Sequence, residues 1–314
     1  MYYLGVDVGG MSIKLGIVDE NGKIVKSSRF TTKKEDPQEV HAIMIGENVN
    51  KLIEESGISK NLIKGVGIGV PGGVRSNGVT GYVPNIPWCD LPLANIVSGV
   101  TDLPVKLGND ADVATLGEAI FGAAKNYNTV VLITIGTGVG GGIVIDKKLY
   151  QGQGMVAELG HVTLRQGGLK CGCGRYGCYE QYASASALIR LTKEKMNENK
   201  NSSMWAFVEN NLENVNGITA FACAKQGDET ANAVVDEFVS YISEGLMNFM
   251  NILRPNAVVI GGGISKEGKY LTDKVKAYCE KFSYGFPSAP TADVLIAELG
   301  NDAGIIGAAS LFAQ

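Results

Sequence analysis

The sequence predicts an α/β protein built from two lobes, and three observations lead to that prediction. Its 314 residues exceed what one compact domain usually needs, so two lobes are the starting expectation. A strand, a glycine-rich turn and a second strand occur within residues 4–18 and again within 130–145. After the first of these hairpins come a helical pattern and a further strand, the mixed order of an α/β lobe. We therefore infer an internally duplicated β-hairpin core, with a cleft between the lobes.

The two hairpins are alike in detail. The first joins residues 4–10 to 13–18, and the polar turn at 19–22 closes it before a third short strand. The second runs from 130–135 through a glycine-rich segment at 136–142 to 143–145, and the turn at 146–148 closes it. Repetition of the same three steps is what indicates duplication.

The remaining elements follow from periodicity. Residues 37–56 have helical spacing, with the expected buried side formed by Val40, Ile43, Met44, Val49, Leu52 and Ile53. We also expect helices at 111–121, 184–197, 232–253 and 302–312, and strands at 64–70, 105–107, 257–260 and 294–297. These elements divide into a smaller lobe, 1–115 joined by 302–314, and a larger lobe, 116–301.

Composition narrows the class of protein. The net charge of −4 disfavours nucleic-acid binding, which needs an excess of lysine and arginine on some face. Residues 1–10 enter a strand directly, without a secretory signal, and no apolar run is long enough for a membrane span. We expect a cytoplasmic protein without membrane partners. Three of its six cysteines lie within 171–178, which favours a metal site over disulfides.

Glycine-rich turns stand between the strands of both hairpins. Residues without side chains let backbone N–H groups approach an anion, so two such turns suggest a pyrophosphate held between the lobes. Neither turn ends as a P-loop does or opens a helix as a Rossmann fingerprint does. The alternative for each turn is a tight hairpin without a ligand. Asp7 ends an apolar strand, where its carboxylate either lies near Mg²⁺ or caps the turn.

One histidine and three cysteines provide ligands for zinc. His161, Cys171, Cys173 and Cys178 supply one nitrogen and three sulfur donors within eighteen residues. This donor set is typical of a closed, tetrahedral, structural Zn²⁺ site that leaves no position for water, and thiolates favour zinc over magnesium. The alternative is a group of unliganded cysteines in a loop.

Two glutamates flank this cysteine and histidine cluster. Glu158 precedes His161 by three residues, and Glu180 follows Cys178 by two. Carboxylates held by a zinc loop suit the recognition of sugar hydroxyls, and the second imidazole nitrogen of His161 could also meet a hydroxyl. For an isolated glutamate, a helix cap or a surface ion pair is the commoner role.

Taken together, these motifs resemble the ROK family of sugar kinases and repressors, and within it the glucokinase branch. The resemblance spans nearly the whole chain and rests on 7–10, 67–72, 109–110, 135–142, 158–161, the cysteine run 171–178, Glu180, 254–255 with 261–263, and 299–304. It implies the duplicated actin, Hsp70 and hexokinase type of fold, with sugar in the cleft between the lobes and ATP on the larger lobe. It also implies phosphorylation of a hexose, with glucose to glucose 6-phosphate expected first.

The resemblance assigns roles residue by residue. Asp110 corresponds to the catalytic base, and the expected sugar contacts are Gly72, Asn109, Asp110, Glu158, His161 and Glu180. The expected nucleotide contacts are Asp7, Gly9, Gly10, Ser12, Gly136, Thr137, Gly138, Gly261, Gly262 and Gly263. ATP and Mg²⁺ are the implied cofactors beside the structural zinc, and a homodimer or homotetramer is the expected assembly.

One departure from the family pattern leaves alternatives open. The family usually carries threonine after the first glycine pair, whereas this chain has Met11, followed by Ser12. A sugar-sensing protein with weak catalysis is therefore the alternative from another class, and an N-acetylmannosamine, N-acetylglucosamine or fructose kinase is the alternative among enzymes. Family repressors carry an added N-terminal helix-turn-helix, whereas Tyr2 here begins the first strand of the family pattern. We therefore do not expect a repressor. The segment 84–88 either lines the sugar pocket or packs Trp88 into the core.

Overall fold

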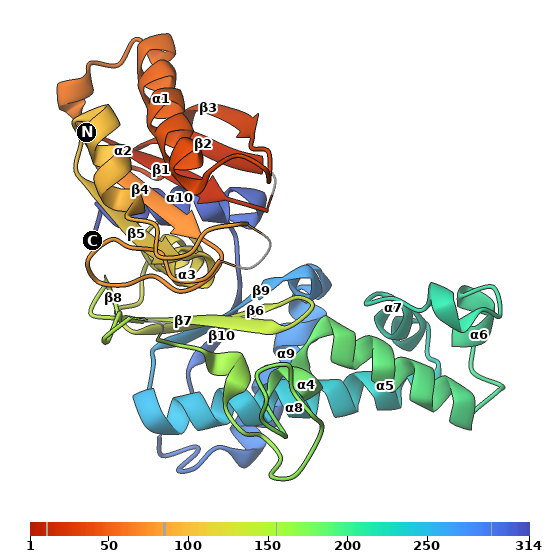
Figure 1. The fold of residues 1–314 in the computed structure, drawn as a ribbon. Coiled ribbons are helices and arrows are strands. Elements are labelled where there is room, and N and C mark those ends of the chain that lie inside the picture. Colours follow the sequence, from red (N-terminus) through yellow and green to blue (C-terminus); the bar gives the residue numbers. More distant parts are fainter. Residues whose placement is uncertain (11, 84–85, 155, 290) are drawn as a thin grey trace. The chain divides into compact units, whose positions relative to one another are not determined.

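The computed structural model describes residues 1–10, 12–83, 86–154, 156–289 and 291–314 (Figure 1). Its contacts divide the chain into two compact units, 1–130 with 142–157 and 297–314, and 131–141 with 158–296. This division differs from the boundary expected after residue 115, which falls inside α3 (Asp110–Ile120). Because α3 packs against α10 (Ala303–Ser310), the whole helix stays with the first unit.

The sheet of the first unit has the strand order β3-β2-β1-β4-β5. Its strands are β1 (Tyr2–Val8), β2 (Ser12–Asp19), β3 (Ile24–Thr31), β4 (Ile63–Val70) and β5 (Val105–Asn109). The first three form an antiparallel meander, whereas β4 and β5 run parallel to β1. Parallel neighbours need crossover helices, and α1 (Gln38–Ser56) and α2 (Leu93–Thr101) provide them.

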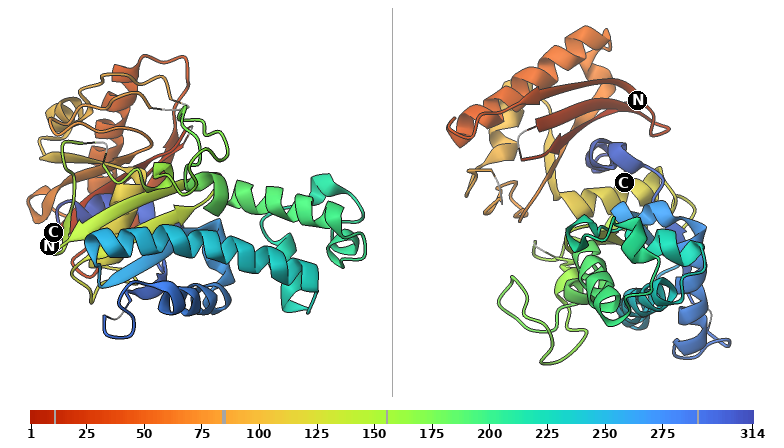
Figure 2. Two further views of the ribbon diagram at one scale, coloured as in Figure 1. Left: turned by 90° about the horizontal axis from the view of Figure 1, so that it is seen from below. Right: turned by 90° about the vertical axis from the view of Figure 1, so that its right-hand side faces the viewer.

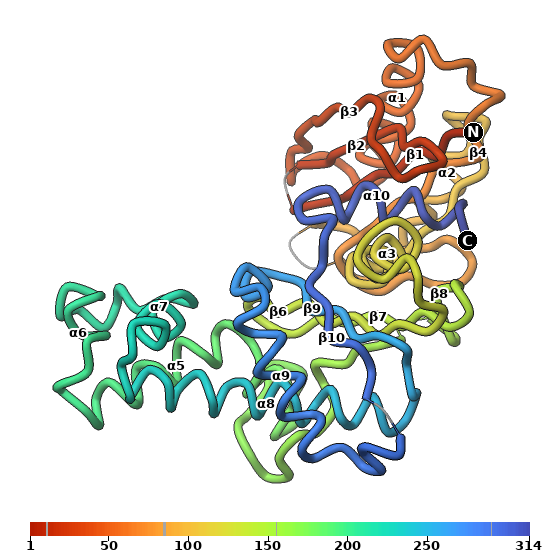
Figure 3. Tube along the Cα trace, turned by 180° about the vertical axis from the view of Figure 1, so that it is seen from behind, coloured from red at the N-terminus to blue at the C-terminus, as the bar shows by residue number. Residues whose placement is uncertain are grey.

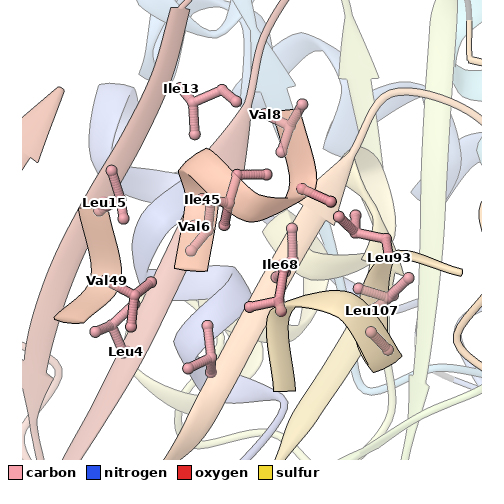
Figure 4. Packing of buried hydrophobic residues seen from close by; sticks show 14 of the residues in the cluster. Leu4, Val6, Val8, Ile13, Leu15, Ile45, Val49, Ile68, Leu93 and Leu107 are labelled. Atoms are coloured by element: carbon pink, nitrogen blue, oxygen red, sulfur yellow. The ribbon is translucent and has the colours of Figure 1, made fainter. Parts of the chain in front are cut away.

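Alternation along β1 gives the sheet two different faces. Leu4, Val6 and Val8 are buried and pack with residues of α1 such as Ile45 (Figure 4). Gly5 points to the other face, where a Cβ atom would lie 1.9 Å from the carbonyl oxygen of Ile305. Only glycine there allows α10 to lie directly on the sheet, beside α3 (Figure 3).

The predicted helix at 37–56 exists as α1, and Val49, Leu52 and Ile53 are buried as expected, but the buried face of its first two turns was assigned incorrectly. Val40 and Ile43, expected inside, are 39% and 41% exposed. The buried face begins instead with His41, Ala42 and Ile45. The polar residue His41 can lie in the core because its ring nitrogen accepts a hydrogen bond from the buried Trp88. Helical periodicity alone does not reveal such a partner.

The second sheet repeats the topology of the first. Its order is β10-β9-β6-β7-β8, formed by β6 (Val130–Ile135), β7 (Val139–Ile145), β8 (Lys148–Leu149), β9 (Ala257–Gly262) and β10 (Asp293–Ile296). If the strands of each sheet are numbered in chain order, both sheets have the strand order 3-2-1-4-5. The pair β7 and β8 is antiparallel and the pair β9 and β10 parallel, like their counterparts. The inferred duplication is confirmed.

The sequence predicted that the glycine-rich segment 136–142 forms one turn, but the structure divides it between a turn and a strand. Strand β7 begins at Val139, so Gly140, Gly141 and Gly142 lie in the strand. A Cβ atom on Gly141 would lie 2.5 Å from Leu159, and one on Gly142 would lie 2.1 Å from the hydroxyl of Thr115. These two glycines therefore permit close packing, and the turn itself is limited to residues 136–138.

Most helices of the second unit follow the second hairpin in sequence. They are the short 3₁₀ turn Leu159–His161, α4 (Glu180–Ala183), α5 (Ala185–Glu198), α6 (Met204–Phe207), α7 (Thr219–Lys225), α8 (Glu229–Leu253) and α9 (Lys269–Phe282). Figure 2 shows α8 as the long cyan helix, and α5, α7 and α9 pack against it. In this unit α5 and α8 were predicted, whereas α4, α6, α7 and α9 were not. In the first unit α1, α3 and α10 were predicted, whereas α2 was not. Within the described ranges, no helix combines the length and apolarity needed to cross a membrane.

Candidate active site

Asn109 and Asp110 lie where β5 passes into α3. Asn109 is the N-cap of α3, and its side-chain oxygen accepts a hydrogen bond from the Ala111 amide at 2.9 Å. Its side-chain amide donates to the carbonyl of Gly72 at 3.0 Å. Gly72 has φ +128°, a conformation that favours glycine. The structure thus brings three predicted site residues together at the first turn of one helix.

Asp110 is the first residue of α3 and is exposed, so a ligand can reach its carboxylate. Enough protein surrounds the carboxyl group for burial to raise its pKa, and the negative charge of Asp7 raises it further. The Ala111 amide, which donates to Oδ1 at 2.8 Å, opposes the increase. A carboxylate in such a setting holds a proton more strongly than an ordinary aspartate, which suits a general base.

Asp7 faces the N-terminus of α10, on the same face of β1 as Gly5. A Cβ atom on Gly304 would lie 2.5 Å from the Asp7 carboxyl carbon, so this glycine makes room for the carboxylate. Lys14, the cross-strand partner of Asp7 on β2, donates to its Oδ2 at 3.2 Å. Sequence reasoning missed Lys14, although the register of the hairpin would have placed it opposite Asp7.

The first glycine turn contains three of the predicted nucleotide contacts. The Gly9 amide donates to the Ser12 carbonyl at 3.0 Å, and Gly10 is exposed. The Ser12 hydroxyl is buried and has no hydrogen-bond partner among the residues that the structure describes. Met11, where the sequence departs from the family pattern, lies outside the described residues.

The second glycine turn is held against the N-terminus of α5. The Gly136 amide donates to the Gly138 carbonyl at 3.0 Å, and the Ala185 amide donates to the Gly136 carbonyl at 2.8 Å. The Ser186 hydroxyl donates to the Thr137 carbonyl at 2.9 Å. Because these carbonyls are occupied, the turn has one fixed shape, with Thr137 exposed at its tip.

The third glycine run lies next to the second glycine turn. Gly262 ends β9 with φ +82°, and a Cβ atom there would lie 2.4 Å from the carbonyl oxygen of Ile135. Gly261 is buried, whereas Gly263 begins the next turn and is exposed. The runs 136–138 and 261–263, predicted to contact one nucleotide, therefore adjoin each other in the second unit.

The predicted zinc ligands converge. The ligand atoms of His161, Cys171, Cys173 and Cys178 all lie within 4.8 Å of one another. The sulfurs of Cys173 and Cys178 are 3.6 Å apart, and Cys171 Sγ is 3.6 Å from His161 Nδ1. Tetrahedral bonds of about 2.3 Å to sulfur and 2.1 Å to nitrogen give edges of roughly 3.6–3.8 Å, so the donors fit zinc.

Burial disfavours ionisation of two of the three thiols, and a bound cation would offset this. Burial raises the pKa of Cys171 to about 12 and also raises the pKa of Cys178. The pKa of the exposed Cys173 is lowered, first by a hydrogen bond from the Arg175 backbone. Zinc binds thiolate, so binding would release protons from the buried cysteines.

Glu180 connects the cysteine and histidine cluster to the glycine turn. Its Oε1 atom is 3.0 Å from Cys171 Sγ and 3.6 Å from His161 Nδ1. A Cβ atom on Gly138 would lie 2.6 Å from Oε2, so the second carboxylate oxygen borders the turn. Glu158 is exposed and caps the 3₁₀ turn that contains His161, with its carbonyl accepting from the His161 amide at 3.0 Å.

Trp88 is part of the core. It is 1% exposed, which favours the packing alternative over a place in the sugar pocket. Pro84 and Asn85, from the same segment, lie outside the described residues. Of the predicted sugar contacts, Gly72, Asn109 and Asp110 belong to the first unit, and Glu158, His161 and Glu180 belong to the second.

Comparison with known proteins gives consistent matches over the full length. Residues 3–314 match the ROK family. The chain is 38% identical over 319 residues to a glucokinase of Halalkalibacterium halodurans, covering 100% of this chain and 95% of that protein. It is 36% identical over 312 residues to a glucokinase of Streptomyces coelicolor, covering 98% and 96%.

A solved structure agrees with these matches. The crystal structure of a ROK family glucokinase from Streptomyces griseus, in complex with glucose and AMPPNP, has a TM-score of 0.78 and 35% identity, and the match covers 99% of each chain. This similarity, together with the repeated sheet order, confirms the predicted fold of the actin and hexokinase type.

Proposed function

The chain belongs to the ROK family, and on that premise we propose that it transfers the γ-phosphoryl group of ATP to a hexose, with glucose as the first expected acceptor. The glucokinases from two other bacteria, each similar over nearly the whole chain, support this activity. The observation that carries the proposal is the position of Asp110, an accessible carboxylate with a raised pKa at the first turn of α3. Its neighbour Asn109 is tethered to Gly72.

The chemical role proposed for Asp110 is that of a general base. A hydroxyl oxygen of the hexose attacks the γ-phosphorus, the bond from that phosphorus to the bridging oxygen of ADP breaks, and Asp110 accepts the hydroxyl proton. Orientation accounts for much of the rate in such reactions. The hydrogen bonds from Ala111 to Asn109 and Asp110 keep both side chains at the helix terminus, where they are oriented before the sugar arrives.

We propose that residues of each unit contact sugar hydroxyls. Asn109 and Gly72 would do so from the first unit. Glu158, His161 and Glu180 would do so from the second, where Nδ1 of His161 faces the sulfur of Cys171 and Nε2 lies on the other side of the ring. Carboxylates accept hydrogen bonds from hydroxyls, and an imidazole nitrogen can accept or donate one, which suits a polyol.

The nucleotide contacts proposed are the three glycine runs. Gly136, Thr137 and Gly138 form a turn whose shape is fixed by α5, and the run 261–263 adjoins it. Gly9, Gly10 and Ser12 would contact phosphate from the first unit, where the buried Ser12 hydroxyl has an unused donor. Mg²⁺, when bound with ATP, offsets phosphate charge, and Asp7 is the carboxylate suited to hold it.

Zinc is proposed as a structural ion. His161, Cys171, Cys173 and Cys178 would fill all four positions of a tetrahedral site, so the ion would hold the loop and leave water unactivated. Glu180 touches this cluster through Cys171, so an ordered zinc loop would also fix the carboxylate. A reducing, ATP-containing cytoplasm suits both the free thiols and the reaction, and we propose that location.

A panel of hexoses tests the proposed function. Purified protein with ATP and Mg²⁺ should release ADP with glucose, and mass spectrometry should detect the hexose phosphate. N-acetylmannosamine, N-acetylglucosamine and fructose in the same panel decide between the enzymatic alternatives. Hexose binding without phosphate transfer to any of these sugars would instead support the sugar-sensing alternative. Light scattering of the same sample tests the proposed homodimer or homotetramer.

A further inference from the structure

A buried histidine and a buried tryptophan, 47 residues apart in sequence, form a hydrogen bond in the first unit. His41 and Trp88 are each 1% exposed. The indole Nε1 of Trp88 is 2.9 Å from His41 Nδ1, and His41 Nε2 is 2.9 Å from the carbonyl oxygen of Lys33. Since an indole N–H can only donate, Nδ1 accepts and Nε2 carries the proton. Both ring nitrogens are thus satisfied by a single neutral tautomer.

The same turn of α1 makes a second contact to this segment. The side-chain oxygen of Gln38 accepts a hydrogen bond from the Cys89 amide at 2.9 Å. Gln38 and His41 are three residues apart and therefore lie on the same side of the helix. Two adjacent residues, Trp88 and Cys89, are consequently fixed to the first turn of α1.

Trp88 belongs to a hydrogen-bonded segment that begins next to Asn109. We call residues 72–83 and 86–91 the anchored segment. Within it, the Val83 amide donates to the Trp88 carbonyl at 3.1 Å, and the Gly81 amide donates to the Gly73 carbonyl at 2.8 Å. The Thr80 amide donates to the Leu91 carbonyl at 2.9 Å. Its first residue, Gly72, accepts the hydrogen bond from Asn109.

We propose that His41 and Trp88 are positioning residues for hexose binding. The contact between their side chains fixes one end of the anchored segment, and internal hydrogen bonds carry that constraint to Gly72 at its other end. Gly72 in turn orients the side chain of Asn109. This inference rests on the proposed function, because it takes Asn109 as a sugar contact. The ion pair between Arg75 and Asp90 also lies in the segment, but both side chains are exposed and such pairs contribute little.

Substitution of Trp88 by phenylalanine tests the contribution of its hydrogen bond while an aromatic ring stays in the core. Trp88→Phe keeps an aromatic ring and removes the N–H, which leaves the buried His41 Nδ1 atom unpaired. We expect the KM for hexose to rise about tenfold, with kcat and the KM for ATP changed by less than about twofold. His41→Ala should give the same pattern. His41→Asn places an amide oxygen near the position of Nδ1 and should restore most of the hexose KM.

The other tryptophan provides the matched control. Trp205 lies in α6 of the second unit, and its Nε1 donates to the Met196 carbonyl at 2.9 Å. Trp205→Phe therefore removes an equivalent hydrogen bond and should leave the hexose KM unchanged. The chain has only two tryptophans, so this variant also makes Trp88 the sole tryptophan, whose emission can be excited selectively at the red edge of the absorption band. In that background His41→Ala should shift the emission to longer wavelength as the indole becomes solvated.

The outcomes distinguish this inference from the proposed function. An unchanged hexose KM in Trp88→Phe, with an active wild-type protein, overturns the positioning role alone. Equal losses in kcat and in both KM values would also overturn it, because they indicate general damage. A wild-type protein that phosphorylates no hexose would refute the proposed function instead. If Trp88→Phe does not fold, His41→Asn compared with His41→Ala decides: equal hexose KM values for these two variants overturn the role.

Discussion

The Oε1 atom of Glu180 lies 3.0 Å from the sulfur of Cys171. The carboxylate proposed to bind sugar is therefore in direct contact with the cluster proposed to bind zinc. The other carboxylate oxygen borders Gly138, in the turn proposed to bind phosphate. Metal, sugar and nucleotide sites would share this one side chain, so disturbance of the metal should be detected in hexose binding.

Metal content and hexose binding should change together. Protein purified without chelator should contain one zinc per chain by elemental analysis. Cys173→Ser removes an exposed ligand and should lower the zinc content. Without zinc, Cys171 no longer holds the Glu180 carboxylate in place, so the KM for hexose should rise by about tenfold. Cys89→Ser replaces an exposed cysteine outside the cluster and keeps the backbone amide that bonds Gln38, so it is the control and should change neither. Absence of any metal in the wild-type protein would contradict the assignment.

Asn109 should affect both stability and sugar affinity. Asn109→Ala removes the N-cap of α3 and the hydrogen bond to Gly72, so unfolding by urea should show a loss of about 1 kcal/mol. The hexose KM should rise at the same time. Asn211→Ala removes a similar cap, at the 3₁₀ turn Leu212–Asn214, and should affect stability without affecting the hexose KM. Equal hexose KM values for the two variants would argue against a sugar contact at Asn109.

The sequence predicted those features that depend on local pattern. Hairpin duplication, the start of α3 near Asp110 and the convergence of His161, Cys171, Cys173 and Cys178 are each set by residues close together in the chain, and all are present. The sequence predicted the buried residues Val49, Leu52 and Ile53 of α1 but not the start of that face, because His41 is stable in the core through its hydrogen bonds to Trp88 and to the Lys33 carbonyl. Likewise, Gly141 resembles a turn residue, and only its contact with Leu159 explains why it lies in a strand.

Glu118, eight residues after Asp110 in α3, should be important for stability. It is 1% exposed, and its two carboxylate oxygens accept hydrogen bonds from the Ala123 and Leu299 amides, both at 2.8 Å. Glu118→Ala leaves both amides without that partner and should cost about 2–4 kcal/mol in urea unfolding. Glu118→Gln keeps one good acceptor and should lose less. Glu198→Ala, at an exposed ion pair, is the control and should change stability by less than about 0.5 kcal/mol.

The raised pKa of Asp110 determines the direction of two pH effects. A base must be ionised, so kcat/KM should fall on the acid side at a pH above the ordinary aspartate value of 3.8. For stability, the folded state binds this proton more strongly than the unfolded state does. The ionised carboxylate therefore opposes folding above the folded-state pKa, and stability attributable to Asp110 increases as pH falls through that pKa.

The stability effect is measured by comparing melting temperatures. Asp110→Asn should melt higher than wild type near neutral pH, and the difference should shrink as the wild-type carboxyl group becomes protonated in acid. A variant that melts lower than wild type at neutral pH would indicate that the charge of Asp110 stabilises the fold, contrary to the direction of its pKa.

Turnover of Asp110→Asn tests the central claim most directly. The variant keeps the shape of the side chain and removes the base, so ADP release with saturating glucose and ATP should fall by at least about 100-fold. Calorimetry should show that glucose affinity stays within a few fold of wild type, which separates catalysis from binding. Turnover close to the wild-type rate would contradict the assignment of Asp110 as the base.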